Sequence, residues 1–186
     1  RIRIRCFFLP PTIPPVKELS RCESPDDING SFAEGTPGII GGDGALSLWK
    51  KKKGFPFYCQ GGGYTTIGTA VLGGNSTVYD AIETSYQFQK DTTYAISIAA
   101  RNWVETENCG DVANAKLMAS TLPNGEGETA EIGNITLKTN ELGWQLIELP
   151  AWLPDLDYQY LSISYDNSGD TDSLCTKYIE LDDICI

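Results

Sequence analysis

From about residue 55 to the C-terminus, the sequence is a series of short segments rich in β-branched and aromatic residues. Gly, Asn, Asp and Pro separate these segments at roughly the 8–12-residue spacing that is typical of a β-sandwich. No long stretch has the 3.6-residue period of an amphipathic helix. We therefore expect an all-β jelly-roll β-sandwich of about nine strands.

Alternation inside one of these segments supports a strand. Between residues 158 and 166, Leu161, Ile163 and Tyr165 alternate with Ser162 and Ser164. Because successive side chains of a strand point to opposite faces, the apolar set and the serines are expected on opposite faces.

The first residues form a different kind of segment, which alternates and then becomes rich in proline. One side of an extended chain would carry Ile2, Ile4, Cys6 and Phe8, and the other side Arg1, Arg3 and Arg5. The prolines between residues 10 and 15 favour an extended connector and cut the apolar stretch too short for a secretory signal. We expect an N-terminal arm at residues 1–26 and one domain at residues 27–186, since this length suits one well-buried core.

Charge is distributed unevenly along the chain. Residues 1–53 hold nine Lys/Arg against six Asp/Glu, whereas residues 54–186 hold five against nineteen. An acidic body is a poor surface for phosphate, so we expect no nucleic-acid partner. No apolar run approaches the roughly 20 residues that cross a bilayer, so membrane insertion is not expected either. The basic arm could be attracted to an acidic body, its own or that of another copy.

The cysteines and short sequons favour a secreted protein. The six cysteines contain no CxxC pair, and no histidine is present to complete a zinc site: Cys6, Cys22, Cys59, Cys109, Cys175 and Cys185. We expect disulfides, with Cys6–Cys22 and Cys175–Cys185 as the nearest pairs, although Cys6 could bond to another chain. N-glycosylation sequons begin at Asn29, Asn75 and Asn134, and two short Asp-Ser/Thr motifs nominate Thr92 and Ser173 for O-glycosylation.

An enzyme is not expected. Without histidine, the chain cannot build a Ser-His-Asp triad, a Cys-His pair or a histidine base. Paired carboxylates could still serve a glycosidase, and Asp155/Asp157 is one such pair. In a chain with 25 acidic residues such pairs arise readily in solvated loops, so we do not assign them a catalytic role.

Three motifs carry a resemblance to a known family. "NGSFAEG" opens the body at Asn29, "GW" occurs within "ELGWQLIEL" around Trp144, and "YIELDDICI" closes the chain from Tyr178. In this order they resemble carbohydrate-binding modules of the family 4/9 type and the wider galactose-binding-like β-sandwiches, over residues 27–186. The resemblance implies a two-sheet jelly roll whose first and last strands lie together, with Trp144 in the core.

Modules of this type often hold a structural calcium between those strands. Calcium needs hard oxygen ligands, and the resemblance implies Glu34, Asp182 and Asp183 as their source. The sequence differs from the family pattern by Ala33, which separates Phe32 from Glu34. The alternative is that Asp182 and Asp183 end a strand in solvent.

Sugar rings pack on aromatic side chains, so the tryptophans are candidate binding residues. Trp49, Trp103 and Trp152 are the candidates for carbohydrate contact. The run Lys50 to Lys53 could hold an anionic polysaccharide or the acidic face of another subunit. Its alternative interpretation is an edge strand protected by lysines.

Two functions remain open. The one we favour is a non-catalytic secreted subunit that assembles head-to-tail into an extracellular or cell-surface filament, by donating its N-terminal strand to an edge of the next copy. The apolar side of the arm would be buried there, and its arginines would face acidic residues. The alternative is a calcium-stabilised carbohydrate-binding module that attaches to polysaccharide. The arm could also fold back on its own sheet.

Overall fold

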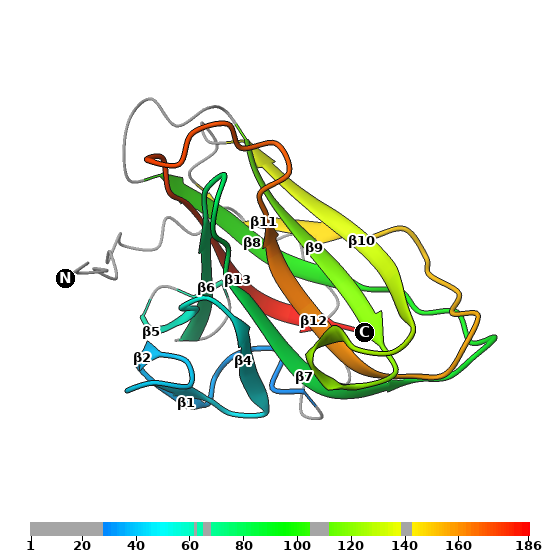
Figure 1. The fold of residues 1–186 in the computed structure, drawn as a ribbon. Helices are drawn as coiled ribbons and strands as arrows, with labels where there is room; N and C mark the ends of the chain where they lie inside the picture. The colour runs from blue at the N-terminus through cyan, green and yellow to red at the C-terminus, as the bar shows by residue number, and fades with distance from the viewer. Residues whose placement is uncertain (1–27, 62, 65–67, 105–111, 139–142) are drawn as a thin grey trace.

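The computed structural model of this chain describes residues 28–61, 63–64, 68–104, 112–138 and 143–186. These residues form two antiparallel β-sheets that pack face to face (Figure 1). Each of the expected segments after residue 55 is a strand, and four further strands precede them. The expected all-β jelly-roll β-sandwich is therefore confirmed.

The first sheet has seven strands in the order β1-β3-β4-β7-β12-β9-β10. Its strands are β1 (Gly35–Thr36), β3 (Ala45–Leu46), β4 (Trp49–Lys53), β7 (Ala81–Phe88), β9 (Val112–Ser120), β10 (Thr129–Lys138) and β12 (Tyr158–Asp166). A 3-10 turn, η1 (Pro123–Gly125), follows β9.

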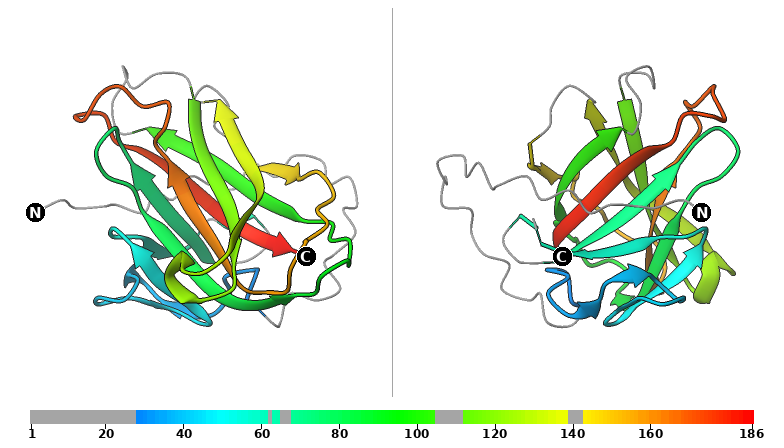
Figure 2. Two further views of the ribbon diagram at one scale, coloured as in Figure 1. Left: turned by 45° about the vertical axis from the view of Figure 1, so that its right-hand side comes forward. Right: turned by 90° about the vertical axis from the view of Figure 1, so that its left-hand side faces the viewer.

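The second sheet has six strands in the order β11-β8-β13-β6-β5-β2 and lies behind the first in Figure 1. Its strands are β2 (Gly38–Ile39), β5 (Phe57–Gln60), β6 (Gly68–Gly74), β8 (Ser97–Val104), β11 (Gln145–Glu148) and β13 (Lys177–Cys185). Figure 2 shows both layers from two further sides.

The core lies between the sheets and follows the alternation of the strands. Leu161 and Ile163 on β12 are fully buried, and so are Ile179 and Leu181 on β13 of the other sheet. Because successive side chains of a strand point to opposite faces, the residues between these core positions point to the outer faces. The outer face of the seven-stranded sheet therefore carries the polar half of its strands.

The beginning and the end of the domain lie side by side. The Ile184 N–H donates to the Gly30 carbonyl at 2.9 Å, and the Trp49 indole N–H donates to the Ile28 carbonyl at 2.7 Å. A Cβ atom on Gly30 would lie 2.2 Å from the Ile184 oxygen, so the close approach of these segments needs glycine. This arrangement agrees with the one that the "NGSF" and "IELDD" motifs implied.

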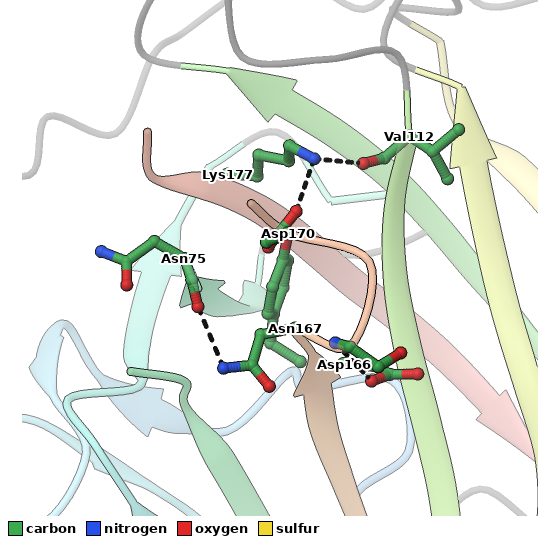
Figure 3. Close-up of polar contacts among 8 residues, drawn as sticks. Asn75, Val112, Asp166, Asn167, Asp170 and Lys177 are labelled. Atoms are coloured by element: carbon green, nitrogen blue, oxygen red, sulfur yellow. Dashed lines mark hydrogen bonds and ion pairs between the residues drawn. The ribbon is translucent and has the colours of Figure 1, made fainter. Parts of the chain in front are cut away.

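A buried ion pair links the two sheets at the connection between β12 and β13 (Figure 3). The Lys177 Nζ atom on β13 lies 2.6 Å from Asp170 Oδ1 and donates to the Val112 carbonyl of β9 at 2.8 Å. The Tyr165 hydroxyl donates to the other Asp170 oxygen at 2.8 Å. Burial, and then the bond to Asp170, raises the pKa of Tyr165 far above its usual value. Both charges of the pair are therefore satisfied inside the sandwich.

Several predictions concern residues outside those that the structure describes. The assembly residues Ile2, Ile4, Cys6, Phe8, Arg1, Arg3 and Arg5 belong to this group, as do Cys22 and Cys109. Among the described cysteines there is no free thiol, since Cys59, Cys175 and Cys185 are disulfide-bonded. The pairing of the cysteines stays a prediction. Within the described ranges, no helix is long and apolar enough to cross a membrane.

Candidate functional site

The outward side chains of the seven-stranded sheet form one polar surface. On β12, Tyr160 lies opposite Ser120 of β9 and Ser85 of β7, and Ser162 lies opposite Glu83 of β7. We call this surface the polar face and define it by Lys50, Lys52, Glu83, Ser85, Asn114, Lys116, Met118, Ser120, Glu131, Asn134, Thr136, Tyr160, Ser162 and Ser164.

A lysine, a glutamate and a serine from three strands meet near the middle of the polar face. The Lys52 ammonium donates to Ser162 Oγ at 2.9 Å and lies 3.9 Å from Glu83 Oε2. The other Glu83 oxygen accepts the Asn124 N–H of η1 at 2.8 Å. Glu83 is only 6% exposed, yet its Oε2 atom receives no hydrogen bond. A buried carboxylate oxygen without a donor is costly, and the ammonium of Lys52 compensates part of its charge.

Side chains toward the β10 edge are held by contacts with one another. The Asn134 amide donates to Glu131 Oε1 at 2.6 Å, and the Lys116 ammonium lies 3.5 Å from Glu131 Oε2. The Thr136 hydroxyl donates to Asn114 Oδ1 at 3.0 Å. Amide, hydroxyl and charged groups are thus fixed side by side over two strands.

Tyr160 is the aromatic side chain of the polar face. It is partly exposed and lies between the serines of the two neighbouring strands. An aromatic ring among hydroxyl groups offers an apolar surface together with hydrogen-bond partners.

The outer face of the six-stranded sheet carries Trp144, which corrects the expectation that this residue belongs to the core. The Arg101 guanidinium carbon lies 4.7 Å from the centre of the Trp144 ring, and the Tyr64 ring lies 6.1 Å from it. Arg101 also donates to Glu180 Oε2 at 2.6 Å. Burial raises the pKa of Glu180, and Arg101 opposes that rise. The charge of Arg101 is therefore already paired.

The tryptophans predicted to contact sugar have different outcomes. Trp49 is 3% exposed and packs against Phe32 with ring centres 5.5 Å apart, so its prediction as a surface platform is wrong. Trp152 is partly buried and packs edge-on against Phe88 at 5.0 Å. The Trp103 side chain lies outside the description. For Trp152 and Trp103, carbohydrate contact stays a prediction.

The residues that the resemblance implied as calcium ligands are not brought together as a set of carboxylates. Asp182 is fully buried, and its two oxygens accept the N–H groups of Tyr64 at 2.6 Å and of Asp183 at 2.8 Å. Glu34 is exposed. Within the described part of the chain, no group of three or more His, Cys, Asp or Glu residues could hold a metal ion. Calcium binding stays a prediction.

Two of the predicted glycosylation sites are unsuited to carry a sugar in the folded chain. Asn29 and Asn75 are each 8% exposed. Their amide nitrogens donate to backbone carbonyls, that of Asn29 to Glu34 at 3.0 Å and that of Asn75 to Ser173 at 3.0 Å. Asn134, Thr92 and Ser173 are exposed and stay predictions.

Solved structures with the same fold are carbohydrate-binding modules. The xylan-binding domain CBM22-1 of Paenibacillus barcinonensis Xyn10C matches at 13% identity, and the match covers 83% of this chain and 88% of that domain (TM-score 0.55). The second xylan-binding domain of the same protein, CBM22-2, matches at 18% identity and covers 78% of this chain and 94% of that domain (TM-score 0.51). The C-terminal family 22 module of Clostridium thermocellum Xyn10B matches at 12% identity, covering 84% and 95% (TM-score 0.51). This chain has the jelly-roll fold of carbohydrate-binding modules. No protein-family model and no curated protein matches it.

At these identities the comparison shows the fold alone. The residues of the polar face are therefore identified from the structure of this chain. The alternation in residues 158–166 separated Ser162 and Ser164 from the core positions and could have nominated Tyr160. Lys52 and Glu83 are 31 positions apart in the sequence and gave no local signal. Only the pairing of β4 with β7 places them on the same side of one sheet.

Proposed function

We propose that this chain is a non-catalytic polysaccharide-binding module that holds a sugar chain on its polar face. The observation that carries this proposal is the partly exposed Tyr160 ring on a face whose polar side chains hold one another in place, Lys52 by Ser162 and Glu83, and Asn134 by Glu131. The fold supports the proposal, because the similar solved domains include xylan-binding domains.

The side chains of the polar face suit the chemistry of a sugar. Each sugar hydroxyl can donate one hydrogen bond and accept others, so it pairs well with neighbouring donors and acceptors. The exposed Glu131 carboxylate would accept from a hydroxyl, while Lys52 and the exposed Ser85 would donate to one. The apolar face of a pyranose ring would stack on Tyr160. Because Lys52 and Glu83 are already fixed by contacts, binding would order few additional side chains.

Binding to a panel of polysaccharides tests the proposal. Isothermal titration calorimetry with soluble xylan, mannan, β-glucan and pectin is expected to detect a ligand for the intact chain. Tyr160→Ala should weaken that binding about fivefold, since an aromatic contact contributes on the order of 1 kcal/mol. Tyr64→Ala removes a tyrosine that packs beside Trp144 near the six-stranded sheet and serves as the matched control, with circular dichroism to verify that both variants fold.

The outcomes separate the two faces. Loss of binding in Tyr160→Ala with retention in Tyr64→Ala supports the polar face. The reverse pattern would move the site to the outer face of the six-stranded sheet. No binding to any of the polysaccharides by the folded chain would refute the proposed function.

The filament function stays a prediction of the sequence. Its donated strand consists of residues outside the described ranges, whereas the binding function depends on described residues. An extracellular location fits either function and is part of the proposal. Structural calcium remains a separate prediction of the resemblance.

A further inference from the structure

The run of four lysines on β4 borders the polar face along a largely open strand edge. On one side β4 pairs with β7, and on the other side only Trp49 pairs with Leu46 of β3. Lys50 is exposed and lies opposite Glu83, on the same side of the sheet as Lys52. The proposed sugar site therefore has exposed positive charge beside it.

Most of this charge has no acidic partner. The ion pairs of the described residues involve Lys52, Arg101, Lys116 and Lys177, so Lys50, Lys51 and Lys53 are in none of them. Lys53 lies 3.8 Å from the centre of the Tyr79 ring, and Lys51 lies 5.7 Å from that of Phe55, contacts that leave both ammonium charges unneutralised. These lysines stand close together in a chain of net charge −11.

We infer that the polar face selects polysaccharides that carry carboxylate groups, such as uronic acid residues, and that Lys50 contacts the carboxylate. This inference rests on the proposed function. Lys52 is already held by Ser162 and Glu83, whereas Lys50 is exposed beside them without a counter-ion. A carboxylate bound there would relieve the repulsion among the lysines, while the sugar ring bearing it would reach the polar face.

A lysine-protected strand edge would explain the same residues differently. Lysines on an open edge prevent edge-to-edge association of strands. That explanation predicts that replacing Lys50 promotes association of copies and leaves the affinity for a sugar unchanged. The two explanations therefore differ in a measurable property.

The test compares polysaccharides that differ only in charge. Calorimetry would measure binding of polygalacturonate against its methyl-esterified form, and of glucuronoxylan against the same xylan after reduction of its carboxyl groups. We expect the charged forms to bind at least about fivefold more tightly at low ionic strength, with the preference shrinking at about 0.5 M salt. Lys50→Gln should weaken binding of the charged form about threefold and spare the neutral form. Lys90→Gln, another exposed lysine, is the matched control with no expected effect.

Three results would overturn the inference. Equal affinity for charged and neutral forms overturns it and leaves the proposed function intact. Association of Lys50→Gln copies in light scattering, with unchanged sugar affinity, assigns the lysines to edge protection or to a second copy. Absence of binding to all four polysaccharides by the folded chain overturns the inference, and it contradicts the proposed function as well if mannan and β-glucan also fail to bind.

Discussion

The buried pair between Lys177 and Asp170 gives the sharpest prediction about stability. The Lys177 side chain is 9% exposed and that of Asp170 is 7% exposed. Lys177→Met keeps most of the side-chain volume but removes the charge. The Asp170 carboxylate would then stay buried with the Tyr165 hydroxyl as its remaining side-chain donor, and the Val112 carbonyl would lose the Lys177 ammonium.

The magnitude follows from the burial of both partners. Removing one partner of a buried ion pair costs about 3–5 kcal/mol, because the other charge is left uncompensated. For a chain of this size each kcal/mol lowers the melting temperature by roughly 2–4 °C, so we expect a drop of about 6–20 °C. Lys116→Met provides the matched control, since Lys116 and Glu131 form a pair with side chains 36% and 47% exposed. That exposed pair should contribute less than about 1 kcal/mol.

Urea unfolding at neutral pH without reductant, followed by circular dichroism, measures both free energies. Adding Asp170→Asn to Lys177→Met removes the uncompensated carboxylate charge and should restore part of the lost stability. A loss below about 1 kcal/mol in Lys177→Met, equal to that in Lys116→Met, would refute the reasoning. So would a double variant whose loss is the sum of the single losses.

Three further predictions concern the core and the opening turn. Gly30→Ala should lower the free energy of unfolding by about 1–3 kcal/mol, since the new methyl group meets the Ile184 oxygen; an unchanged urea midpoint would contradict this. Trp49→Phe should cost about 1–3 kcal/mol by leaving the Ile28 carbonyl without its donor, and calorimetry should find sugar binding unchanged. Burial, and then the bond to Asp155, raises the pKa of Tyr158 from 10.0 to about 12. Its contribution to stability is therefore present below pH 10 and lost as the pH rises toward 12, and unfolding of Tyr158→Phe should show a shallower alkaline decline.

The fold could be predicted because its signals are local. Turn residues separate the later strands, and alternation within residues 158–166 distinguishes core positions from outward ones. The shortest strands were harder to predict, since β1, β2 and β3 have two residues each and are defined by their partners.

The tryptophans show where local signals mislead. Trp49 precedes four lysines in the sequence, yet its side chain points inward. Side chains alternate along β4, and Trp49 lies opposite Thr84 of β7. Trp144 precedes β11 and contacts Arg101, a residue of β8 that is 43 positions away in the sequence. Contacts between distant segments decide both placements, and neither can be read from neighbouring residues.

Glu83 is the residue whose replacement best separates binding from stability. Glu83→Gln keeps an oxygen for the Asn124 N–H but replaces the carboxylate oxygen that faces Lys52 with an amide group. Because Lys52, the partner of this carboxylate, is partly exposed, the free energy of unfolding should change by less than about 1 kcal/mol. Lys52 would lose the carboxylate that holds it beside Ser162, so binding through Lys52 should weaken about threefold. A residue that only supports the fold would give the opposite pattern, lower stability with unchanged affinity, and that result in paired calorimetry and urea titrations would remove Glu83 from the binding site.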